Sequence, residues 1–319
     1  MLWQKRTAIA ALLLLPLLFG CGRPLQTIHI GVRTASDHVP FYLSEHEGLY
    51  RTAGLSVTLH LVPSNTEIVE ALQRGDLQVG ALPVTTALTA IDQGASIRIV
   101  AMTGRGSDGL LVRQDSAIRS WPDLRGKRIA TIKASILEIL LRQALQAHGL
   151  DPETDVSLIY FQKLGDMISA LQTGQVEATS NTEPFMTDAV RQGWGYIVGY
   201  YTEQWPDHPC CVVVAREDFI RERPEDLARV LRCHTQAVEQ VNADLAGAAE
   251  IIVEYLQAFD PALVEASLVP DKMRVDYAFS DEEIGRMARL MRDQGLLEHD
   301  PGALQFTDPA PLARALEGR

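Results

Sequence analysis

A five-residue segment occurs twice in this chain, each time in the same kind of surroundings. Ala71–Gly75 reads ALQRG and Ala170–Gly174 reads ALQTG, so the copies differ only at the fourth position. Each copy ends an amphipathic helical pattern. A strand-like run and a turn that contains proline follow it, with Pro83 in one copy and Pro184 in the other. A helix, a glycine stop, a strand and a polar turn used twice predict two similar α/β lobes. Small ligands often bind between two such lobes.

The composition supports two folded lobes and excludes one class of partner. The chain has 319 residues, of which 46% are hydrophobic, enough for two domains that each bury a core. Its formal net charge of −12 is a poor match to nucleic-acid binding, which depends on clustered lysine and arginine. We therefore expect no nucleic-acid partner, although a local basic site for a small anion is compatible with this charge.

The first residues have the pattern of an export signal. Lys5 and Arg6 precede an apolar run, Ala8–Phe19, which is too short to span a bilayer comfortably and matches the hydrophobic part of a signal peptide. The run leads into Leu-Phe-Gly-Cys, which is similar to a lipobox, where cleavage precedes the cysteine and the cysteine carries the lipid. We predict a lipoprotein signal peptide over residues 1–20 and lipidation of Cys21. An ordinary secretion signal that happens to end in cysteine is the alternative.

Three further cysteines would meet the oxidising compartment to which an exported chain is delivered. Cys210 and Cys211 are adjacent, a spacing that disfavours a disulfide between them, and Cys233 is the third. No Cys-x-x-Cys pair is present, which excludes a thioredoxin-like motif and a zinc ribbon. A metal site made by His208, Cys210 and Cys211 is an alternative that the tight spacing disfavours. We expect no cofactor and no metal.

Strand and helix patterns alternate along most of the chain, which is typical of parallel sheets covered by helices. The predicted strands are Thr27–Val32, Val57–Val62, Leu77–Leu82, Ile97–Met102, Gly109–Arg113, Arg128–Ile132, Val156–Phe161, Val176–Ser180, Tyr196–Tyr200 and Cys211–Ala215. Thr103–Asp108 is predicted to be a loop, and Pro40–Gly54 a single helix. From Arg223 onward the pattern is largely helical, so we expect this tail to pack on the lobes.

The order of these elements predicts how the chain is divided. After a linker at 21–26, lobe one takes residues 27–108 and, with the C-terminal helices, 212–319. Lobe two takes residues 109–211. The chain then crosses between the lobes twice, and two crossing strands form a hinge.

Several segments carry a resemblance to a known family. They are Ile30–Val32, Gly75–Ala81 (GDLQVGA), Ser120–Ala130 (SWPDLRGKRIA), Met167–Ala178 (MISALQTGQVEA), Glu183–Phe185 and Asp218–Ile220. With them the chain resembles the periplasmic substrate-binding proteins of ABC importers, in the group for nitrate, sulfonates, taurine and thiamine precursors. The similarity runs from about Gln26 to about Leu256. It implies an α/β, two-lobed periplasmic-binding-protein-like fold of type II, each lobe a mostly parallel sheet flanked by helices, with a helical C-terminal tail.

The resemblance also implies a role and partners. The chain would capture a small anionic or nitrogen- or sulfur-containing solute (nitrate, a sulfonate, taurine or a pyrimidine) in the interlobe cleft. It would deliver the solute to an ABC permease in the inner membrane, as a lipid-anchored monomer in the periplasm or at the cell surface. Two alternatives stay open: an enzyme of the thiamine-pyrimidine or menaquinone type on the same scaffold, and a sensor for a membrane signalling partner. Gly-x-Ser-x-Gly, His-Glu-x-x-His and the P-loop are absent from the sequence, and we expect no enzyme.

Ligands of two-lobed α/β proteins bind beyond the carboxyl ends of the strands, where helices begin. The candidate ligand-binding residues at these places are Ser36, His38, Pro83, Thr85, Thr86, Arg105, Lys133, Ser135, Asn181, Glu183 and Cys210. The hydroxyls and free helix N–H groups suit an anion, as does bidentate bonding by Arg105. Lys133 would balance a negative charge, and Glu183 would bind an amine or an amino-pyrimidine edge, or pair with one of these cations.

Each candidate also has a purely structural interpretation. His38 would belong to a polar loop, while Thr85 and Ser135 would cap helices. Arg105 would be a solvated hinge arginine, Glu183 a carboxylate that caps the following helix, and Cys210 a small buried residue.

Overall fold

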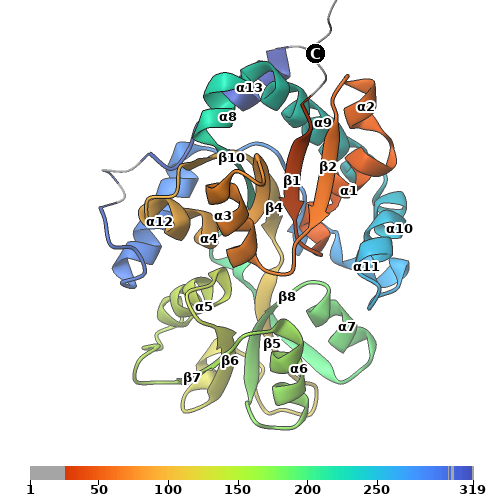
Figure 1. Ribbon diagram of the computed structural model, residues 1–319. Helices are drawn as coiled ribbons and strands as arrows, with labels where there is room; N and C mark the ends of the chain where they lie inside the picture. Colours follow the sequence, from red (N-terminus) through yellow and green to blue (C-terminus); the bar gives the residue numbers. More distant parts are fainter. Residues whose placement is uncertain (1–25, 301, 303–304, 318–319) are drawn as a thin grey trace, which may run out of the picture.

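The chain folds into two α/β lobes joined by two crossing segments (Figure 1). This description rests on a computed structural model, which describes residues 26–300, 302 and 305–317. The predicted signal peptide and the lipidation site at Cys21 lie outside the described residues. The α/β class, the two sheets with flanking helices and the helical C-terminal region are confirmed.

Lobe one contains a six-stranded sheet, and lobe two a five-stranded sheet. The first sheet has the order β11-β4-β10-β3-β1-β2, and the second β7-β6-β8-β5-β9. The strands of lobe one are β1 (Ile28–Val32), β2 (Val57–Leu61), β3 (Val79–Pro83), β4 (Ile97–Gly106), β10 (Pro209–Arg216) and β11 (Met273–Arg274). Those of lobe two are β5 (Asp108–Arg113), β6 (Arg128–Ile132), β7 (Ser157–Phe161), β8 (Ala178–Thr182) and β9 (Gly195–Tyr200).

In each sheet, one long strand is antiparallel to its neighbours. In both cases it is the strand that enters from the other lobe. In lobe one, β1 is parallel to β2 and β3, whereas β10 is antiparallel to β3 and β4. In lobe two, β6 is parallel to β7 and β8, whereas β5 is antiparallel to β8 and β9. The carboxyl ends of the other long strands therefore face the crossing segments from both sides, which is where α/β proteins bind ligands.

Helices cover both sheets. In lobe one they are α1 (Val39–His46), α2 (Leu49–Thr52), α3 (Asn65–Arg74), α4 (Val84–Asp92), α8 (Glu217–Glu222), α9 (Pro224–Ala243), α10 (Leu245–Tyr255), α11 (Pro261–Ser267), α12 (Asp281–Asp293) and α13 (Ala310–Glu317). In lobe two they are α5 (Ile136–Ala147), α6 (Leu164–Gln172) and α7 (Phe185–Arg191). Short 3-10 helices are η1 (Ser36–His38), η2 (Trp121–Leu124) and η3 (Tyr201–Glu203).

Two hydrophobic cores hold these layers together. On one face of the first sheet, Phe41 of α1 and Leu231 of α9 pack in a single cluster with the strands. On the other face, Leu72 of α3 belongs to a cluster that continues into lobe two through Leu110 and Leu140. Because the second cluster spans both lobes, the lobes are attached by packed side chains as well as by the chain itself.

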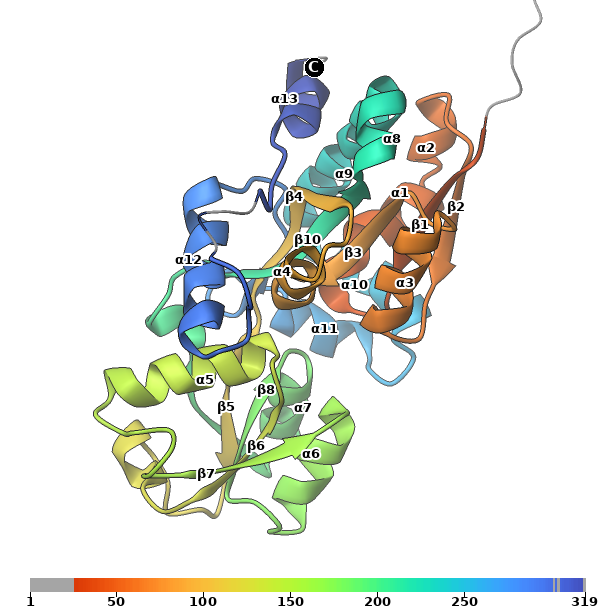
Figure 2. The ribbon, with the colours of Figure 1, turned by 60° about the vertical axis from the view of Figure 1, so that its left-hand side comes forward.

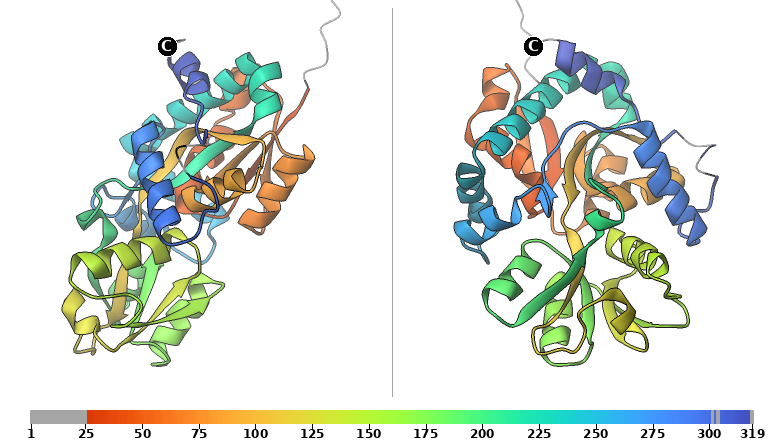
Figure 3. Two further views of the ribbon diagram at one scale, coloured as in Figure 1. Left: turned by 90° about the vertical axis from the view of Figure 1, so that its left-hand side faces the viewer. Right: turned by 180° about the vertical axis from the view of Figure 1, so that it is seen from behind.

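The C-terminal region returns to the crossing segments and contacts lobe two on both sides (Figures 2 and 3). Arg191 of α7 forms an ion pair of 2.8 Å with Asp260, next to α11. At the end of α12, the Gln294 side chain donates to the carbonyl of Ile139 at 3.4 Å. The prediction that the tail packs on the lobes is therefore correct, but it missed the short strand β11 at the sheet edge.

The predicted loop at Thr103–Asp108 was wrong, because β4 continues to Gly106 and only Ser107 separates it from β5. Strands β10 and β11 bond to the two edges of this stretch and supply partners that its polar sequence does not reveal. Gly106 has a φ of 70°, and a Cβ there would lie 2.5 Å from the carbonyl oxygen of Lys272. Glycine is thus required where the C-terminal segment crosses the hinge.

Two local predictions about helices were also wrong. The helix expected over Pro40–Gly54 is broken at Gly48, which has a φ of 65°. The Ser135 side chain does not cap its helix as expected, since its hydroxyl donates to the carbonyl of Ile132, and Glu138 instead accepts from the backbone N–H of Ala134.

Within the described part of the chain, no helix combines the length and apolar character needed to cross a membrane.

A buried histidine makes stability depend on pH. His234 of α9 is fully buried, its Nε2 lies 2.8 Å from the carbonyl oxygen of Met102, and burial lowers its pKa from 6.5 to about 4. Because the pKa of His234 is lower in the folded state than in the unfolded state, the unfolded state binds a proton more readily between pH 4 and pH 6.5. We expect this group's contribution to the unfolding free energy to be complete above pH 6.5 and to fall by about 3 kcal/mol as the pH drops to 4.

Urea unfolding of the wild type and of His234→Gln at several pH values isolates this contribution. The stability advantage of the wild type should shrink from pH 7 to pH 4. If the difference in unfolding free energy between wild type and His234→Gln stays constant from pH 7 to pH 4, His234 is not the source of the pH dependence.

Candidate functional site

The strand ends of the two lobes meet at the crossing segments. The hydroxyls of Ser107 and Thr182 are 2.7 Å apart, and the backbone N–H of Glu183 donates to the carbonyl of Ser107 at 2.9 Å. On the returning segment, the Cys210 Sγ lies 3.7 Å from the Ser107 hydroxyl. We call this region the lobe junction; it comprises Ser36–His38, Ser107–Asp108, Thr182–Glu183 and His208–Cys211.

Two predicted ligand residues place buried polar atoms at the lobe junction without a partner in the described structure. Ser36 is 4% exposed and His38 1%, and neither the Ser36 Oγ nor the His38 Nε2 forms a hydrogen bond with another described residue. An unsatisfied buried polar atom costs about 1–3 kcal/mol. A polar ligand at the lobe junction would therefore gain free energy by forming hydrogen bonds with these two atoms.

The loop that carries them is held firmly. The Tyr42 hydroxyl accepts from the backbone N–H of Ala35 at 3.1 Å and donates to the carbonyl of Arg33. The Nδ1 of His38 lies 3.1 Å from both the N and the O of Arg33, and burial lowers the pKa of His38. The ring is thus neutral near pH 7 and is oriented through Nδ1, so that Nε2 stays free.

Asp37, between these two residues, is a buried carboxylate that the sequence analysis did not select. A Cβ at Gly104 would lie 2.4 Å from the Asp37 Cβ, so β4 admits this side chain only because it has glycine there. The Thr103 hydroxyl donates to the Asp37 carbonyl at 2.7 Å. Asp37, His38 and Cys211 each offer one ligand atom to a metal ion, and these atoms all lie within 4.8 Å of one another.

The alternative metal site of His208, Cys210 and Cys211 does not form. The His208 Nε2 faces the Asp108 carboxylate at 3.3 Å, and both side chains are almost completely buried. Burial raises the pKa of Asp108, which the hydrogen bond from His208 partly offsets. This pair belongs to the lobe junction but lies on the side of lobe two.

Glu183 has both carboxylate oxygens occupied within lobe two. It accepts from the Tyr200 hydroxyl and, at 3.1 Å, from the backbone N–H of Thr187 at the start of α7. Burial raises the pKa of Glu183, while these hydrogen bonds oppose the shift. The arrangement matches the structural interpretation, a carboxylate that caps the following helix. Direct solute binding by Glu183 stays a prediction.

Arg105 connects the hinge to the C-terminal segment. It donates five hydrogen bonds: to Asp276, twice to Glu283, and to the carbonyls of Asp207 and Ala278. Although burial lowers the pKa of Arg105, the hydrogen bonds and charge of Glu283 and Asp276 raise it overall. Since protein oxygens occupy all of its donors, we do not carry Arg105 into the proposed solute site.

The remaining candidate residues differ in whether their polar groups are free to bind a solute. Pro83 ends β3, and the buried Thr85 and half-buried Thr86 lie in the first turn of α4. Pro83 also pairs with Cys211, which places this turn next to Asp37. It is thus the second element of lobe one that reaches the lobe junction.

On lobe two, the Lys133 side chain is exposed, with its ammonium 6.0 Å from the ring centroid of Tyr160. Ser135 is occupied by the bond described above. The fully buried Asn181 accepts from the backbone N–H of Thr182 at 2.9 Å and donates to the carbonyl of Leu164 at 3.4 Å. Lys133 is therefore the exposed cation at this strand end, whereas Asn181 shapes the turn.

The thiols of the lobe junction are poor nucleophiles. The hydrogen bond with Cys210 and burial hold the pKa of the Cys211 thiol well above its usual value. For Cys210, the hydrogen bond with Cys211 lowers the pKa, but burial and the negative charges of Asp108 and Asp37 together outweigh it and raise the pKa to about 11. Cys210, Cys211 and Cys233 are all free in the described structure. Reactive cysteines need lowered pKa values, so these three are not suited to covalent catalysis.

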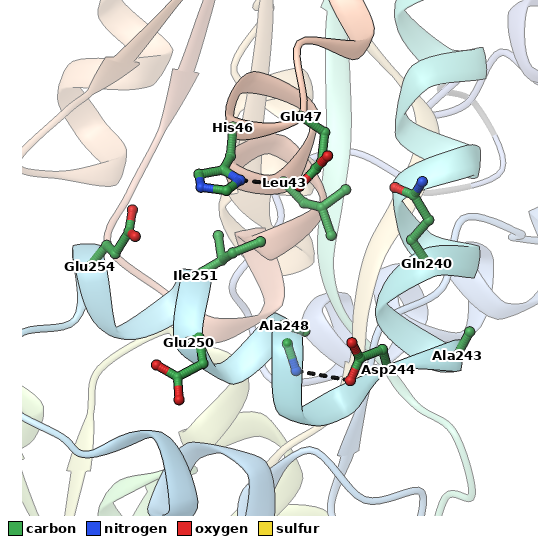
Figure 4. A pocket seen from close by; sticks show the side chains of 11 residues that line it. Leu43, His46, Glu47, Gln240, Ala243, Asp244, Ala248, Glu250, Ile251 and Glu254 are labelled. Carbon is green, nitrogen blue, oxygen red and sulfur yellow. Dashed lines mark hydrogen bonds and ion pairs between the residues drawn. The ribbon is translucent and has the colours of Figure 1, made fainter.

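A separate pocket of about 560 Å³ lies on lobe one between α1, α9 and α10 (Figure 4). Its polar lining includes His46, Glu47, Asp244, Glu250 and Glu254. It lies on the helical surface away from the strand ends, so we do not assign the solute to it.

Sequence and structure comparisons identify the family. The model of the NMT1-like family matches residues 22–256, which is most of the chain. The protein belongs to the NMT1-like family. It is 26% identical over 203 residues to the taurine-binding periplasmic protein of Escherichia coli (strain K12), covering 63% of this chain and 62% of that protein. It is 23% identical over 239 residues to the nitrate import ATP-binding protein NrtC of Synechocystis sp., covering 69% of this chain and only 36% of that longer protein.

Two solved structures show the same fold. The periplasmic aliphatic sulphonate binding protein SsuA from Escherichia coli matches with a TM-score of 0.77 and 20% identity, over 89% of this chain and 92% of that one. The periplasmic nitrate-binding protein NrtA from Synechocystis PCC 6803 matches with a TM-score of 0.79 and 15% identity, over 92% and 89%. At these identities the likeness establishes the architecture and leaves the bound solute open.

The buried ion pairs of Arg105 should dominate the stability of the hinge. Its side chain is 7% exposed, and those of Asp276 and Glu283 are 17% and 18% exposed. Arg105→Ala leaves Glu283 without its cation and Asp276 with Arg274 alone, and it should lower the unfolding free energy by about 3 kcal/mol. Urea denaturation measures this loss. Arg74→Ala, which removes a well-exposed ion-pairing arginine, is the control and should barely move the midpoint. Equal, small effects of both substitutions would contradict the role of Arg105.

Proposed function

We propose that this protein is the extracytoplasmic solute-binding component of an ABC importer. The observation that carries the proposal is the pair of buried, unsatisfied atoms, the Ser36 Oγ and the His38 Nε2, where the strand ends of two lobes meet. Membership of the NMT1-like family supports it, as do relatives named for taurine binding and nitrate import. Lipidation of Cys21 would keep the protein beside its permease.

The two lobes and their hinge suit capture followed by delivery. Only Ser107 separates β4 from β5, and the return runs through residues 201–208, so the lobes can rotate about two short crossings. A solute that contacts both lobes stabilises the closed form, which a permease can distinguish from the open form. This role needs no covalent chemistry.

The charges near the lobe junction restrict the solute. Arg105 is fully bonded, so an oxyanion would be bound by the free N–H groups at the start of α4, by hydroxyls and by Lys133. The buried Asp37 carboxylate adds a negative charge at the same place, which favours a solute that also carries an amine or another hydrogen-bond donor. Among nitrate, sulfonates, taurine and pyrimidines, an amino-sulfonate such as taurine offers both groups.

A thermal-shift screen tests the binding role. The purified protein is heated with nitrate, bicarbonate, taurine, alkanesulfonates, phosphonates, hydroxymethylpyrimidine and polyamines in turn. A solute at 100 times its dissociation constant should stabilise the fold by about 2.7 kcal/mol. We expect one chemical class to raise the melting temperature, with taurine above the simple alkanesulfonates. No shift from any of them, with a cleft shown to be empty by mass spectrometry of the denatured protein, would contradict the proposal.

Ser36→Ala tests the place of binding. A hydrogen bond to a charged group contributes about 1.5–3 kcal/mol, so its loss should raise the dissociation constant of the solute about tenfold or more. Calorimetry measures the change. Ser169→Ala, on the exposed face of α6, is the control and should bind as the wild type does. An unchanged affinity in Ser36→Ala would place the solute elsewhere.

A further inference from the structure

We propose that Asp37, His38 and Cys211 form a binding site for a divalent transition-metal ion of the zinc class. No metal was expected from the sequence, and the site lies within the proposed solute region. The test below uses the metal ion alone. A failure of the importer role therefore leaves the site standing, and a failure of the site leaves solute binding open.

The three ligand atoms are close enough to share one ion. One nitrogen of His38, the Cys211 Sγ and a carboxylate oxygen of Asp37 all lie within 4.8 Å of one another. Zinc bonds of about 2.0–2.3 Å at tetrahedral angles place ligand atoms roughly 3.5 Å apart. Small side-chain rotations bring the three atoms to that spacing, because Asp37 and His38 share one short helix, η1, and Cys211 lies on the neighbouring β10.

The ligand types select a borderline-soft cation. A thiolate, an imidazole and a carboxylate together suit zinc, whereas magnesium and calcium prefer oxygen alone. The His38 Nδ1 lies 3.1 Å from both the N and the O of Arg33. Metal binding through Nε2 selects the tautomer in which Nδ1 donates to the Arg33 carbonyl and Nε2 carries the lone pair. A backbone carbonyl on the second ring nitrogen is the usual support for a metal-bound histidine.

The free Nε2 is an independent observation that points to a ligand. It is a buried donor or acceptor that forms no hydrogen bond with another described residue, on a side chain only 1% exposed. The nearby Asp37 carboxylate is also buried, and it shares a hydrogen bond with the Cys211 thiol. A bound dication satisfies the imidazole and neutralises the two negative charges of the carboxylate and the thiolate.

The site also leaves room for one more ligand. Three protein ligands leave a fourth tetrahedral position, which is typical of zinc sites that bind an exchangeable group. Asp37 and Cys211 are 6% and 7% exposed, so the cluster is not completely closed to solvent. Binding replaces the thiol proton of Cys211 and releases it to solvent.

Calorimetric titration of the purified, untagged protein with zinc chloride tests the proposal. We expect one high-affinity ion per chain. With cobalt(II) instead, we expect the near-ultraviolet charge-transfer absorption of a cobalt–thiolate bond. His38→Ala, Asp37→Asn and Cys211→Ser should each raise the zinc dissociation constant more than about tenfold, since even loss of an outer-shell partner costs 10–100-fold. Cys211→Ser should also remove the charge-transfer absorption.

Cys233→Ser is the matched control, because Cys233 is an equally buried free cysteine on α9 outside the cluster. It should keep both the affinity and the absorption. Circular dichroism identifies any variant that fails to fold, and Asp37→Asn, which preserves the shape of the side chain, keeps the test decisive in that case. A folded wild type that binds no zinc, or one whose binding is unchanged in Asp37→Asn and His38→Ala, would overturn the proposal.

Discussion

The architecture depends on how β4 becomes β5. The strand leaves lobe one at its carboxyl end and, after Ser107 alone, enters lobe two against the direction of β8. The same change of strand direction occurs in lobe one, where the returning strand β10 is antiparallel to β3. Since each lobe is entered from the junction, its other long strands must present their carboxyl ends to the junction. The polar turns of both lobes are thereby collected in one region, where Arg105 ties the hinge to the C-terminal segment.

The polar side chains of the lobe junction are of two kinds: those bonded to the protein and those free to bind a ligand. Arg105, Glu183 and Asn181 form hydrogen bonds with other parts of the protein and shape the turns and the hinge. Ser36 and His38 have buried atoms without a described partner, beside the carboxylate of Asp37. The available groups therefore belong to the loop after β1, and for this reason we propose this loop of lobe one as the centre of solute recognition. Lobe two contributes the exposed Lys133 at the opposite strand end.

Periodicity and glycine stops were enough to predict two lobes and most of the strands along the chain. They were not enough where distant segments decide the outcome. The extension of β4 to Gly106 depends on bonds to β10 and β11, and the partners of Arg105 come from Asp207 and the segment around Glu283. Asp37 was missed although it lies between two selected residues. Its burial depends on Gly104, which no local pattern connects to it.

Hydrogen–deuterium exchange with and without the solute found in the thermal-shift screen shows whether one solute is bound by strand-end turns of both lobes. We expect slower exchange of backbone amides in two sets of peptides at once. One set covers residues 33–38 and 83–86 of lobe one, and the other covers 133–136 and 181–184 of lobe two. Protection confined to a single lobe, or to the pocket between α1 and α10, would contradict this expectation.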